Sequence, residues 1–471
     1  MILPVLQKEV VMKRLFLVLL VFGAVVPCLG EAPYNAMGEM AGEVGLHSVI
    51  LQTRLTAFAS RDSAGVVPGA EGWVSFELSS IDNFSDSRFT PWRQATLEND
   101  FIVKERVAGL SADTPYFYRV HIGESVGRSD RLGPRRSFRT APEPDLQRDV
   151  SFTVVTSHKY TAVDHPDGYN SYAAMTRLRP DFIICTGDNV YYDSDSPPGV
   201  DLKTCRNLWH RTFSLPRLVT FYGLVPAYWE KDDHDYRFDD ADPYMPNHNP
   251  YQPDLQPGSV DDETGRRIFL EQVPVGNRTY RTVRWGSALQ VWLTEGRDFR
   301  SPNDMPDGPG KTMWGIEQRR WLKRTILESK ALFKVLVSPS PLLGPDRADK
   351  KDNQANRLGF FTEGQNFLKW LAENKVRNFY IVCGDRHWKY RSVHLETGLE
   401  EFCCGALGDG SSVKNPDYSD PAVERKFYLG NGGFLLVRVK AERVSEPAIV
   451  FDLCEQDGRA AYSVRRPYKD Q

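Results

Sequence analysis

Cysteine is scarce in this chain, at seven of 471 residues. The cysteine spacings match no pattern of a structural zinc site or of a small scaffold held by disulfides. Cys185 and Cys383 lie inside the apolar runs FIIC and FYIVC, so we expect both to be inert core residues. The pairing of the remaining cysteines stays open.

Neither sign of charge dominates the sequence. The 59 Lys and Arg residues and the 62 Asp and Glu residues give a net charge of −3. This balance argues against a protein that binds nucleic acid through bulk positive charge, so we expect no stable nucleic-acid partner. A substrate anion would have to be bound by local cations or by metal ions. The length predicts two domains, and no repeat or low-complexity tract is present.

Long apolar runs are confined to the N-terminus. Lys13 and Arg14 precede an apolar run from Leu15 to Val26, and small residues follow up to Gly30. The run is shorter than the roughly 20 residues that span a bilayer, so it predicts a secretory signal peptide at 1–30 rather than a membrane anchor. We therefore expect an exported protein (periplasmic, cell-surface or extracellular) without integral membrane association.

Short alternating strands separated by turns fill residues 40–140. The clearest are 47–55, 72–78, 100–107 and 115–122. Tyr116 and Tyr118 fall in the stretch GLSADTPYFYRV, and a tyrosine placed just ahead of a late strand, with its hydroxyl returning to the backbone, is typical of Greek-key sandwiches. We predict an all-β sandwich, similar to fibronectin type III or immunoglobulin-like domains, over 31–145. The Pro-rich stretch FRTAPEPD ends it.

The pattern changes from Val150 onward. The runs SFTVVTS, PDFIICTGD and VRNFYIVCGD are almost continuously apolar, as in strands buried on both faces, and α/β sheets place ligands at the carboxyl ends of such strands. Helical patterns cover 169–178, 315–329 and 363–374, and further strands are expected at 281–296, 433–441 and 448–454. These patterns predict an α/β domain over 146–471, with a long surface loop at 239–265.

Metal-binding side chains follow four of the apolar segments. They are His158 in TSH, Asp188 in GDNVYY, Asp233 and His234 in DDHD, and Asp385 and His387 in GDRH. Carboxylates and imidazoles suit zinc, manganese or iron, and two ions about 3.5–4 Å apart can hold both oxygens of a phosphoryl displacement. Each segment alone is a weak signal, because Gly-Asp is a common turn and DDHD is compatible with a solvated loop. Together they predict a metal centre.

Residues 150–440 resemble the alkaline phosphatase D (PhoD-like) branch of the calcineurin-type metallophosphoesterases. Asp188 and Tyr191 match the family's Gly-Asp-x-x-Tyr motif, and Asp233 with His234 matches its Trp-Asp-Asp-His segment. The other matching segments are LTEGRDFRS (293–301), WGIEQRRWL (314–322), DNQAN (352–356) and GDRHW (384–388). The resemblance implies an all-β sandwich before a four-layer α/β metallophosphoesterase domain, and an alkaline phosphatase or phosphodiesterase activity on small phosphoesters.

The resemblance also implies roles for single residues. Asp188 would bridge the metals, Tyr191 would bind ferric iron as a phenolate, and His234 would protonate the leaving oxygen after attack by a metal-activated hydroxide. Arg297, as a catalytic group, and Arg300, as a substrate-binding group, would pair with phosphate oxygens; a structural ion pair is the alternative for both. The remaining implied metal ligands are His158, Asp233, Asp385 and His387.

The sequence departs from the family pattern in three places. Relatives usually have Ser-Cys-Gln where this chain has Ser157-His158-Lys159, so an imidazole would replace a thiolate ligand. Two or more metal ions are expected, iron and calcium by resemblance, and His158 would also admit zinc or manganese. Glu295 stands where the family has aspartate. Near DNQAN, Asp352 and Asn356 are both candidates for a later ligand.

Two other functions remain open at this point. A two-metal site can also accept DNA or RNA, which would make the protein a secreted nuclease-type phosphodiesterase. A damaged metal site would instead leave a non-catalytic, surface-binding member of the same fold. A formylglycine-type sulfatase is excluded, because the sequence has neither Cys-x-Pro-x-Arg nor Ser-x-Pro-x-Arg. The sequence identifies neither the substrate nor the oligomeric state.

Overall fold

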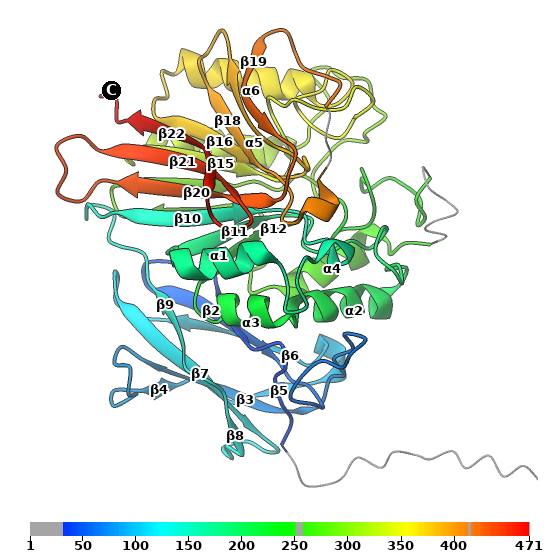
Figure 1. Ribbon diagram of the computed structural model, residues 1–471, viewed down its shortest axis with the longest axis vertical. Coiled ribbons are helices and arrows are strands. Elements are labelled where there is room, and N and C mark those ends of the chain that lie inside the picture. The colour runs from blue at the N-terminus through cyan, green and yellow to red at the C-terminus, as the bar shows by residue number, and fades with distance from the viewer. Residues whose placement is uncertain (1–31, 251–257, 413–415, 471) are drawn as a thin grey trace, which may run out of the picture. The chain divides into compact units, whose positions relative to one another are not determined.

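Two large β-sheets with helices on their outer faces form the main body of the described chain (Figure 1). The computed structural model describes residues 32–250, 258–412 and 416–470. The predicted signal peptide at 1–30 therefore lies outside the described residues, as do positions 251–257 of the predicted loop. Among the residues that are described, no helix has the length and apolar character needed to cross a membrane.

The first sheet has nine strands in the order β22-β21-β20-β10-β11-β12-β1-β2-β6. Its centre is parallel, because β10 pairs with β11 and β11 with β12 in the same direction. An antiparallel extension of β20, β21 and β22 follows on one side. The bounds are β10 (Val150–Val155), β11 (Phe182–Thr186), β12 (Ala227–Glu230), β20 (Gly433–Lys440), β21 (Ala448–Glu455) and β22 (Ala460–Pro467).

The second sheet has seven strands in the order β13-β14-β15-β16-β18-β17-β19, of which β14, β15, β16 and β18 are parallel. Its inner face packs on the first sheet through a core of fully buried side chains, such as Phe152 and Ile184 against Val335 and Val382. The bounds are β13 (Arg281–Trp285), β14 (Leu289–Leu293), β15 (Phe333–Ser338), β16 (Phe379–Cys383), β17 (Lys389–His394), β18 (Glu400–Cys404) and β19 (Val423–Leu429).

Helices cover the outer faces of both sheets. Tyr172 of α1 and Trp209 of α2 pack on Cys185 and Trp229 of the first sheet. Leu322 of α5 packs on the second sheet with α6 beside it. The bounds are α1 (Asn170–Leu178), α2 (Leu202–Phe213), α3 (Pro216–Tyr222), α4 (Asp262–Gln272), α5 (Gly315–Glu328) and α6 (Phe361–Glu373).

Three of these helices were predicted from the sequence and three were not. The predictions of α1, α5 and α6 are confirmed to within a few residues. The helix α4 begins inside the loop predicted at 239–265, which corrects that prediction at its carboxyl end. Gly265 lowers the helical propensity of this segment, yet a Cβ there would collide with the carbonyl oxygen of Tyr236. The sequence analysis assigned no helix to α2 or α3.

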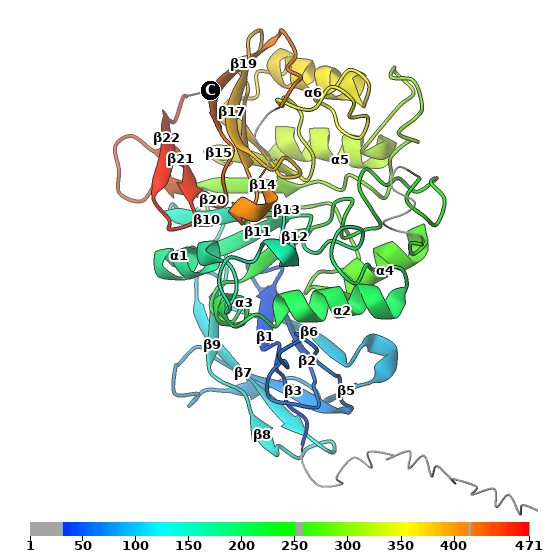
Figure 2. The same ribbon diagram turned by 45° about the vertical axis from the view of Figure 1, so that its right-hand side comes forward.

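The N-terminal region is an all-β structure whose two sheets enclose a separate core (Figure 2). The predicted strands are present, and the backbone N–H of Ser111 donates to the Tyr116 hydroxyl at 2.9 Å. The strands are β1 (Glu39–Gly42), β2 (Ser48–Arg54) and β6 (Ile102–Ala108), facing β3 (Gly72–Ser79), β4 (Arg88–Phe89), β5 (Arg93–Ala95), β7 (Pro115–Gly123), β8 (Arg131–Leu132) and β9 (Arg136–Arg139).

One feature of this region does not follow from the sequence pattern. The strands β1, β2 and β6 continue the first sheet, because Gly42 of β1 pairs in parallel with Ala227 of β12. A Cβ at Gly42 would collide with the carbonyl of Pro274, so glycine permits this close approach. The N-terminal region thus extends the sheet that bears part of the candidate site.

All six described cysteines are free and buried. Cys185 and Cys383 are fully buried, as predicted for core residues. No disulfide is present within residues 32–250, 258–412 and 416–470.

Candidate metal centre

The carboxyl ends of the parallel strands of both sheets meet at one edge, where Thr156 and Ala406 form an isolated bridge between them. Ser157, Asp188 and Asp385 follow β10, β11 and β16 there, with φ angles of 62°, 52° and 60°. Residues other than glycine rarely adopt this left-handed conformation, which costs about 1–3 kcal/mol and is concentrated at functional sites. Three such residues therefore mark this edge as a site.

Both glycines of the Gly-Asp motifs allow close packing at this edge. A Cβ at Gly187 would lie 2.5 Å from the Cβ of Asp232, in the neighbouring strand-end turn. A Cβ at Gly384 would collide with the side chain of Thr186, so this glycine lets the two sheets approach each other. Space therefore requires glycine at both motifs, and at Gly187 the φ angle of 84° favours glycine as well.

Most of the predicted site residues gather around Asp188. Ligand atoms of Asp188, Asp233 and His234 all lie within 4.8 Å of one another. The Tyr191 hydroxyl donates to Asp188 Oδ2 at 3.1 Å and lies 3.0 Å from His387 Nε2. His387 Nε2 is itself 3.9 Å from the same carboxylate oxygen. Carboxylates, a phenol and imidazoles are thus brought together from three separate parts of the chain.

This donor set suits a divalent or trivalent cation. Asp188 Oδ1 is buried and has no hydrogen-bond partner among the described residues, although its other oxygen has one. Burial raises the pKa of Asp188 well above its usual range, and the carboxylates of Asp233 and Asp385 raise it further against the opposing effect of His234. Buried carboxylates in this arrangement require positive charge, and a metal ion would supply it.

His387 is held as a neutral imidazole. Burial, and then repulsion from His234, lowers the pKa of His387 to about 4. The neutral form is the one that binds a metal ion.

His234 is positioned by a carboxylate that the sequence analysis missed. Its Nδ1 lies 2.7 Å from Asp193 Oδ1, and its ring lies 4.2 Å from the Tyr191 ring, centre to centre. Burial lowers the pKa of His234, but the nearby carboxylates, Asp193 foremost, outweigh this and raise the pKa well above its usual value. The signal in the sequence is the aspartate two residues after Tyr191 in GDNVYYD.

A small cleft of about 70 Å³ opens beside these residues. Its lining includes His234, Asp385 and His387, so three of the predicted site residues face one space. The other lining residues are Asp239, Arg347, Lys350, Arg386 and Trp388.

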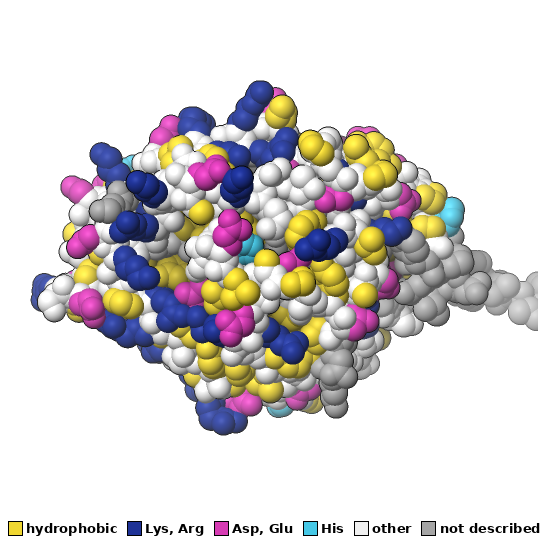
Figure 3. Space-filling view, turned by 90° about the horizontal axis from the view of Figure 1, so that it is seen from above, with side chains coloured by type: hydrophobic (Ala, Val, Ile, Leu, Met, Phe, Trp, Pro, Cys, Tyr) yellow, Lys and Arg dark blue, Asp and Glu magenta, His cyan; other side chains and the backbone are white. Residues whose placement is uncertain are grey.

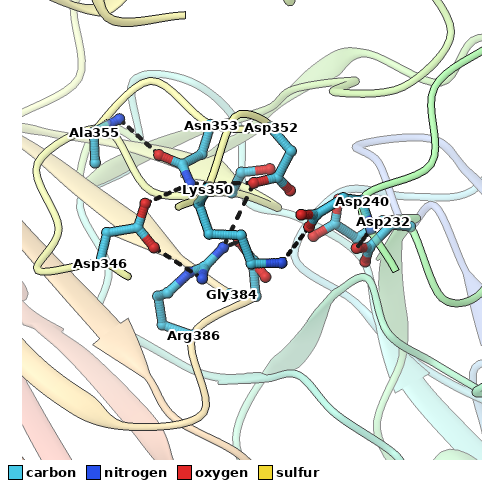
Figure 4. Close-up of polar contacts among 12 residues, drawn as sticks. Asp232, Asp240, Asp346, Lys350, Asp352, Asn353, Ala355, Gly384 and Arg386 are labelled. Atoms are coloured by element: carbon cyan, nitrogen blue, oxygen red, sulfur yellow. Dashed lines mark hydrogen bonds and ion pairs between the residues drawn. The ribbon is translucent and has the colours of Figure 1, made fainter. Parts of the chain in front are cut away.

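A second group of carboxylates, Asp233, Asp239 and Asp240, lies beside the first. The ammonium group of Lys350 lies 3.2 Å from Asp239 and also contacts Asp240 (Figure 4). Lys350 therefore supplies positive charge to this second group.

His158 does not join the carboxylates. Its ring packs among Tyr169, Tyr172 and Phe213, and its Nε2 lies 2.5 Å from the Tyr172 hydroxyl. The neighbouring Ser157 faces the site instead, since its Oγ lies 2.8 Å from the Tyr191 hydroxyl. The geometry does not support an imidazole ligand here, because the left-handed turn directs residue 157, not 158, toward the site.

Arg297 and Arg300 are both buried and bonded within the protein, although Nη2 of Arg300 has no hydrogen-bond partner among the described residues. Arg297 lies 2.5 Å from Asp232 and 3.3 Å from Asp352. The Arg300 guanidinium donates to the carbonyl of Gly296 at 2.6 Å and to Asn303 at 3.0 Å. These contacts favour the structural alternative for the two arginines. Neither side chain lines the cleft.

Asp352 and Asn356, the two candidates for a later ligand, also bond within the protein. Asp352 pairs with Arg297, and Asn356 donates to Asp346 at 3.3 Å. Asp346 in turn lies 2.9 Å from Arg386 (Figure 4). The DNQAN segment thus ties its loop to the GDRH turn.

Glu295 has a structural partner as well. It accepts a hydrogen bond from Lys231 at 2.6 Å and one from the backbone of Arg297 at 2.7 Å.

Two family models match the chain. One described as PhoD-like phosphatase matches residues 152–431, and one described as PhoD-like phosphatase, N-terminal domain, matches residues 31–142. Alkaline phosphatase D of Bacillus subtilis (strain 168) is 20% identical over 419 residues, which cover 79% of this chain and 67% of that protein.

Two solved structures have similar folds. A structure of PhoD superposes with a TM-score of 0.72 at 16% identity, covering 94% of this chain and 93% of the other. A purple acid phosphatase from yellow lupin (Lupinus luteus) seeds superposes with a TM-score of 0.61 at 11% identity, covering 91% and 73%. At these identities the likeness is one of fold alone.

Proposed function

We propose that this chain, which belongs to the PhoD-like phosphatase family and is a phosphoric ester hydrolase, acts as an exported, metal-dependent enzyme on small phosphate esters. The observation that supports metal dependence most directly is the buried Oδ1 of Asp188, which has no hydrogen-bond partner among the described residues and lies in a group of ligand atoms, shared with Asp233 and His234, within 4.8 Å of one another. Export rests on the sequence pattern of residues 1–30.

The proposed metal ligands are oxygen-rich. Asp188, Tyr191 and Asp233 offer carboxylate and phenol oxygens, and His387 offers a neutral imidazole. Asp385 lines the same cleft and is the remaining proposed ligand. Bound ions would polarise the phosphoryl oxygens and activate water for attack. Two or more ions are proposed. Zinc or manganese was considered because the His158 imidazole would replace a thiolate, and His158 is not among the proposed ligands. Iron with calcium therefore remains the combination implied by resemblance.

His234 is the proposed proton donor to the leaving oxygen. Asp193 holds its Nδ1 at 2.7 Å, so the ring orientation is fixed and Nε2 is the nitrogen left to act. The ring lines the cleft beside Asp385 and His387. A histidine held protonated by neighbouring carboxylates is suited to donate a proton near neutral pH.

The finer description of the architecture is also a proposal. The hydrogen bond to Tyr116 supports a fibronectin type III-like or immunoglobulin-like sandwich at 31–145. The rest of the chain, 146–471, is proposed to form the four-layer metallophosphoesterase domain.

Metal analysis and a phosphoester panel test the proposed function. We expect two or more tightly bound ions per chain. Hydrolysis of aryl phosphate monoesters or diesters should stop when a chelator removes the ions and return when they are restored. Monoester against diester rates then separate a phosphatase from a diesterase. A metal-replete preparation that binds no ion, or hydrolyses neither class, would contradict the proposal.

The variant Asp188→Asn tests the proposed metal ligands directly, and Asp82→Asn is its matched control. We expect Asp188→Asn to lower metal content itself, because it removes charge from the proposed bridging ligand. Asp82→Asn removes an exposed carboxylate that pairs with Arg135 in the N-terminal region, and should leave metal content unchanged.

A further inference from the structure

The cleft beside the proposed metal centre is lined by three cationic side chains, Arg347, Lys350 and Arg386. Its volume of about 70 Å³ is roughly twice the ~30 Å³ that one water molecule occupies in the liquid. A small oxyanion fits such a space. The question is which cation remains able to bind it.

Two of the three cations are already neutralised. Lys350 pairs with Asp239 and Asp240 and its side chain is only 4% exposed. Arg386 pairs with Asp346 at 2.9 Å and with Asp385, and its side chain is 3% exposed. A substrate anion would have to displace buried carboxylates to reach either one, which is unfavourable.

Arg347 differs from both. Its side chain is 43% exposed, and the only carboxylate that pairs with it among the described residues is Asp349, at 3.9 Å and itself 84% exposed. Its Nε is buried without a hydrogen-bond partner among those residues, as is the Nε of Arg386, so exposure and the lack of a close carboxylate are what set Arg347 apart. A buried N–H without an acceptor is costly unless a ligand supplies one.

The backbone of Arg347 is nevertheless fixed. Its carbonyl oxygen accepts hydrogen bonds from Asn356 Nδ2 at 2.7 Å and from the backbone of Lys350 at 3.3 Å. The preceding Asp346 is bridged to Tyr418. Asp346 also holds Arg386, as the close-up shows (Figure 4). A free guanidinium on an anchored backbone is suited to binding, because little backbone entropy is lost when a ligand arrives.

We propose that Arg347 binds the phosphoryl group of the substrate. This is the role that the sequence resemblance implied for Arg297 and Arg300. The planar guanidinium can give two parallel N–H bonds to two phosphoryl oxygens. This inference rests on the proposed function, since it places the phosphoryl group in the cleft that His234, Asp385 and His387 line.

The test uses the metal-replete full-length protein and inorganic phosphate as the probe. The dissociation constant of phosphate is measured by calorimetry, and kcat and KM are measured with an aryl phosphate monoester. Arg347→Ala should weaken phosphate binding and lower kcat/KM by about 10–100-fold, as expected for a lost charge-assisted hydrogen-bond pair. Arg347→Lys should recover only part of the loss, because it keeps the charge without the fork.

Lys351→Ala is the matched control. Lys351 lies on the same loop, its side chain is 51% exposed, and it pairs at 3.7 Å with Asp304. It does not line the cleft, so this variant should bind phosphate as the wild type does. Metal content and thermal unfolding are measured for every variant, and Arg347→Gln replaces Arg347→Ala if the latter folds poorly.

The outcomes separate this inference from the proposed function. Wild-type affinity for phosphate in Arg347→Ala and Arg347→Gln overturns the role of Arg347, whether or not the wild type hydrolyses esters. A wild type that binds phosphate through Arg347 but hydrolyses no ester upholds the role and contradicts the proposed function. A metal-replete wild type that binds no phosphate overturns the role as well.

Discussion

At the scale of single residues, the sharpest prediction concerns His234. Its Nδ1 is committed to Asp193 and its ring lines the cleft, so its loss removes the proposed proton donor. We expect His234→Ala to lower turnover by about 10²–10⁴-fold while most of the metal is retained. Steady-state kinetics with metal analysis of the same sample checks this. Full activity in the variant would exclude the role.

Asp193 is predicted to act as a positioning residue. Its carboxylate is the foremost group raising the pKa of His234, against the effect of burial. Asp193→Asn should therefore lower that pKa. A group that must be protonated to act loses activity as pH rises through its pKa, so the basic limb of the pH–rate profile should move to lower pH.

The control for Asp193 is the double variant with His234→Ala. Since the carboxylate acts through the imidazole, removing both should cost no more than removing His234 alone. If the basic limb of the pH–rate profile does not move in Asp193→Asn, Asp193 does not act through the pKa of His234. The same follows if the losses of turnover in the two single variants add up in the double variant.

His158 gives a prediction of the opposite kind. Its imidazole bonds to the Tyr172 hydroxyl inside an aromatic core, away from the carboxylates. We expect His158→Gln to lower thermal stability without lowering metal content. Ser157→Ala tests the neighbouring position, whose Oγ lies 2.8 Å from the Tyr191 hydroxyl. Loss of metal in His158→Gln, at unchanged folding, would restore the imidazole as a ligand.

Ser157 and His158 also show which features of the site the sequence predicts and which it does not. Gly-Asp motifs after apolar strands located Asp188 and Asp385, because strand ends of an α/β sheet meet at one edge. Which of Ser157 and His158 faces that edge depends on the φ angle of 62° at Ser157, and no local pattern indicates it. The sequence left open whether Arg297 meets phosphate or forms an ion pair for a related reason, since its partner Asp232 comes from a different strand end.

At the scale of elements, Glu401 of β18 anchors the loop that follows β15. Its buried carboxylate accepts the backbone N–H groups of Leu342, Leu343 and Gly344 and the hydroxyl of Tyr390. That loop leads directly to Arg347 and Lys350. The strand therefore helps to place the cationic wall of the cleft.

Glu401→Gln is predicted to destabilise the protein by about 2–4 kcal/mol, because an amide nitrogen would face backbone donors that then lack an acceptor. Burial raises the pKa of Glu401 to about 7, so urea unfolding should be measured near pH 8.5, where the carboxylate is ionised. The exposed Glu396 supplies the control Glu396→Gln. Equal stability of both variants would contradict the anchoring role.

The helices α1, α5 and α6 were predicted from their regular apolar spacing. The spacing of α2 is regular as well, because Leu202, Cys205, Trp209 and Phe213 recur every three or four residues, so the sequence does contain the signal for this helix. What no local window indicates is the pairing of Arg206 with Glu271 and of His210 with Asp100, which lie far away in the sequence.

At the scale of the whole molecule, charge is distributed without a dominant sign. Lys and Arg side chains are interspersed with Asp and Glu on the face seen in Figure 3. The net charge of −3 agrees with this mixture. Long-range steering of anions is therefore weak, and capture of a phosphoester depends on groups inside the cleft.

The N-terminal region and the remainder of the chain share one sheet and a buried polar cluster. Asp100 lies 3.3 Å from Arg54 of β2 and 2.5 Å from His210 of α2, and it accepts from Gln272 of α4 at 2.8 Å. Composition and spacing indicated two domains. They did not indicate this connection, since its bonded partners are separated by up to 172 positions along the chain.

The last prediction tests that connection through pH. Burial alone would raise the pKa of Asp100, but the hydrogen bond with His210 and the charge of Arg54 lower it from 3.8 to about 2. A lowered carboxylate pKa adds stability above the unfolded value, and this stability is lost as pH falls from about 4 toward 2. The contribution is about 2 kcal/mol.

Asp100→Asn should therefore be less stable than the wild type at pH 7 by about 2–4 kcal/mol, and the two unfolding curves should converge as pH falls toward 2. Asparagine tolerates the φ angle of 52° at this position, so the variant isolates the charge. Asp82→Asn, at an exposed pair with Arg135, should follow the wild type throughout. If the difference in the free energy of unfolding between wild type and Asp100→Asn stays constant from pH 7 to 2.5, the ionised carboxylate does not stabilise the connection between the two regions.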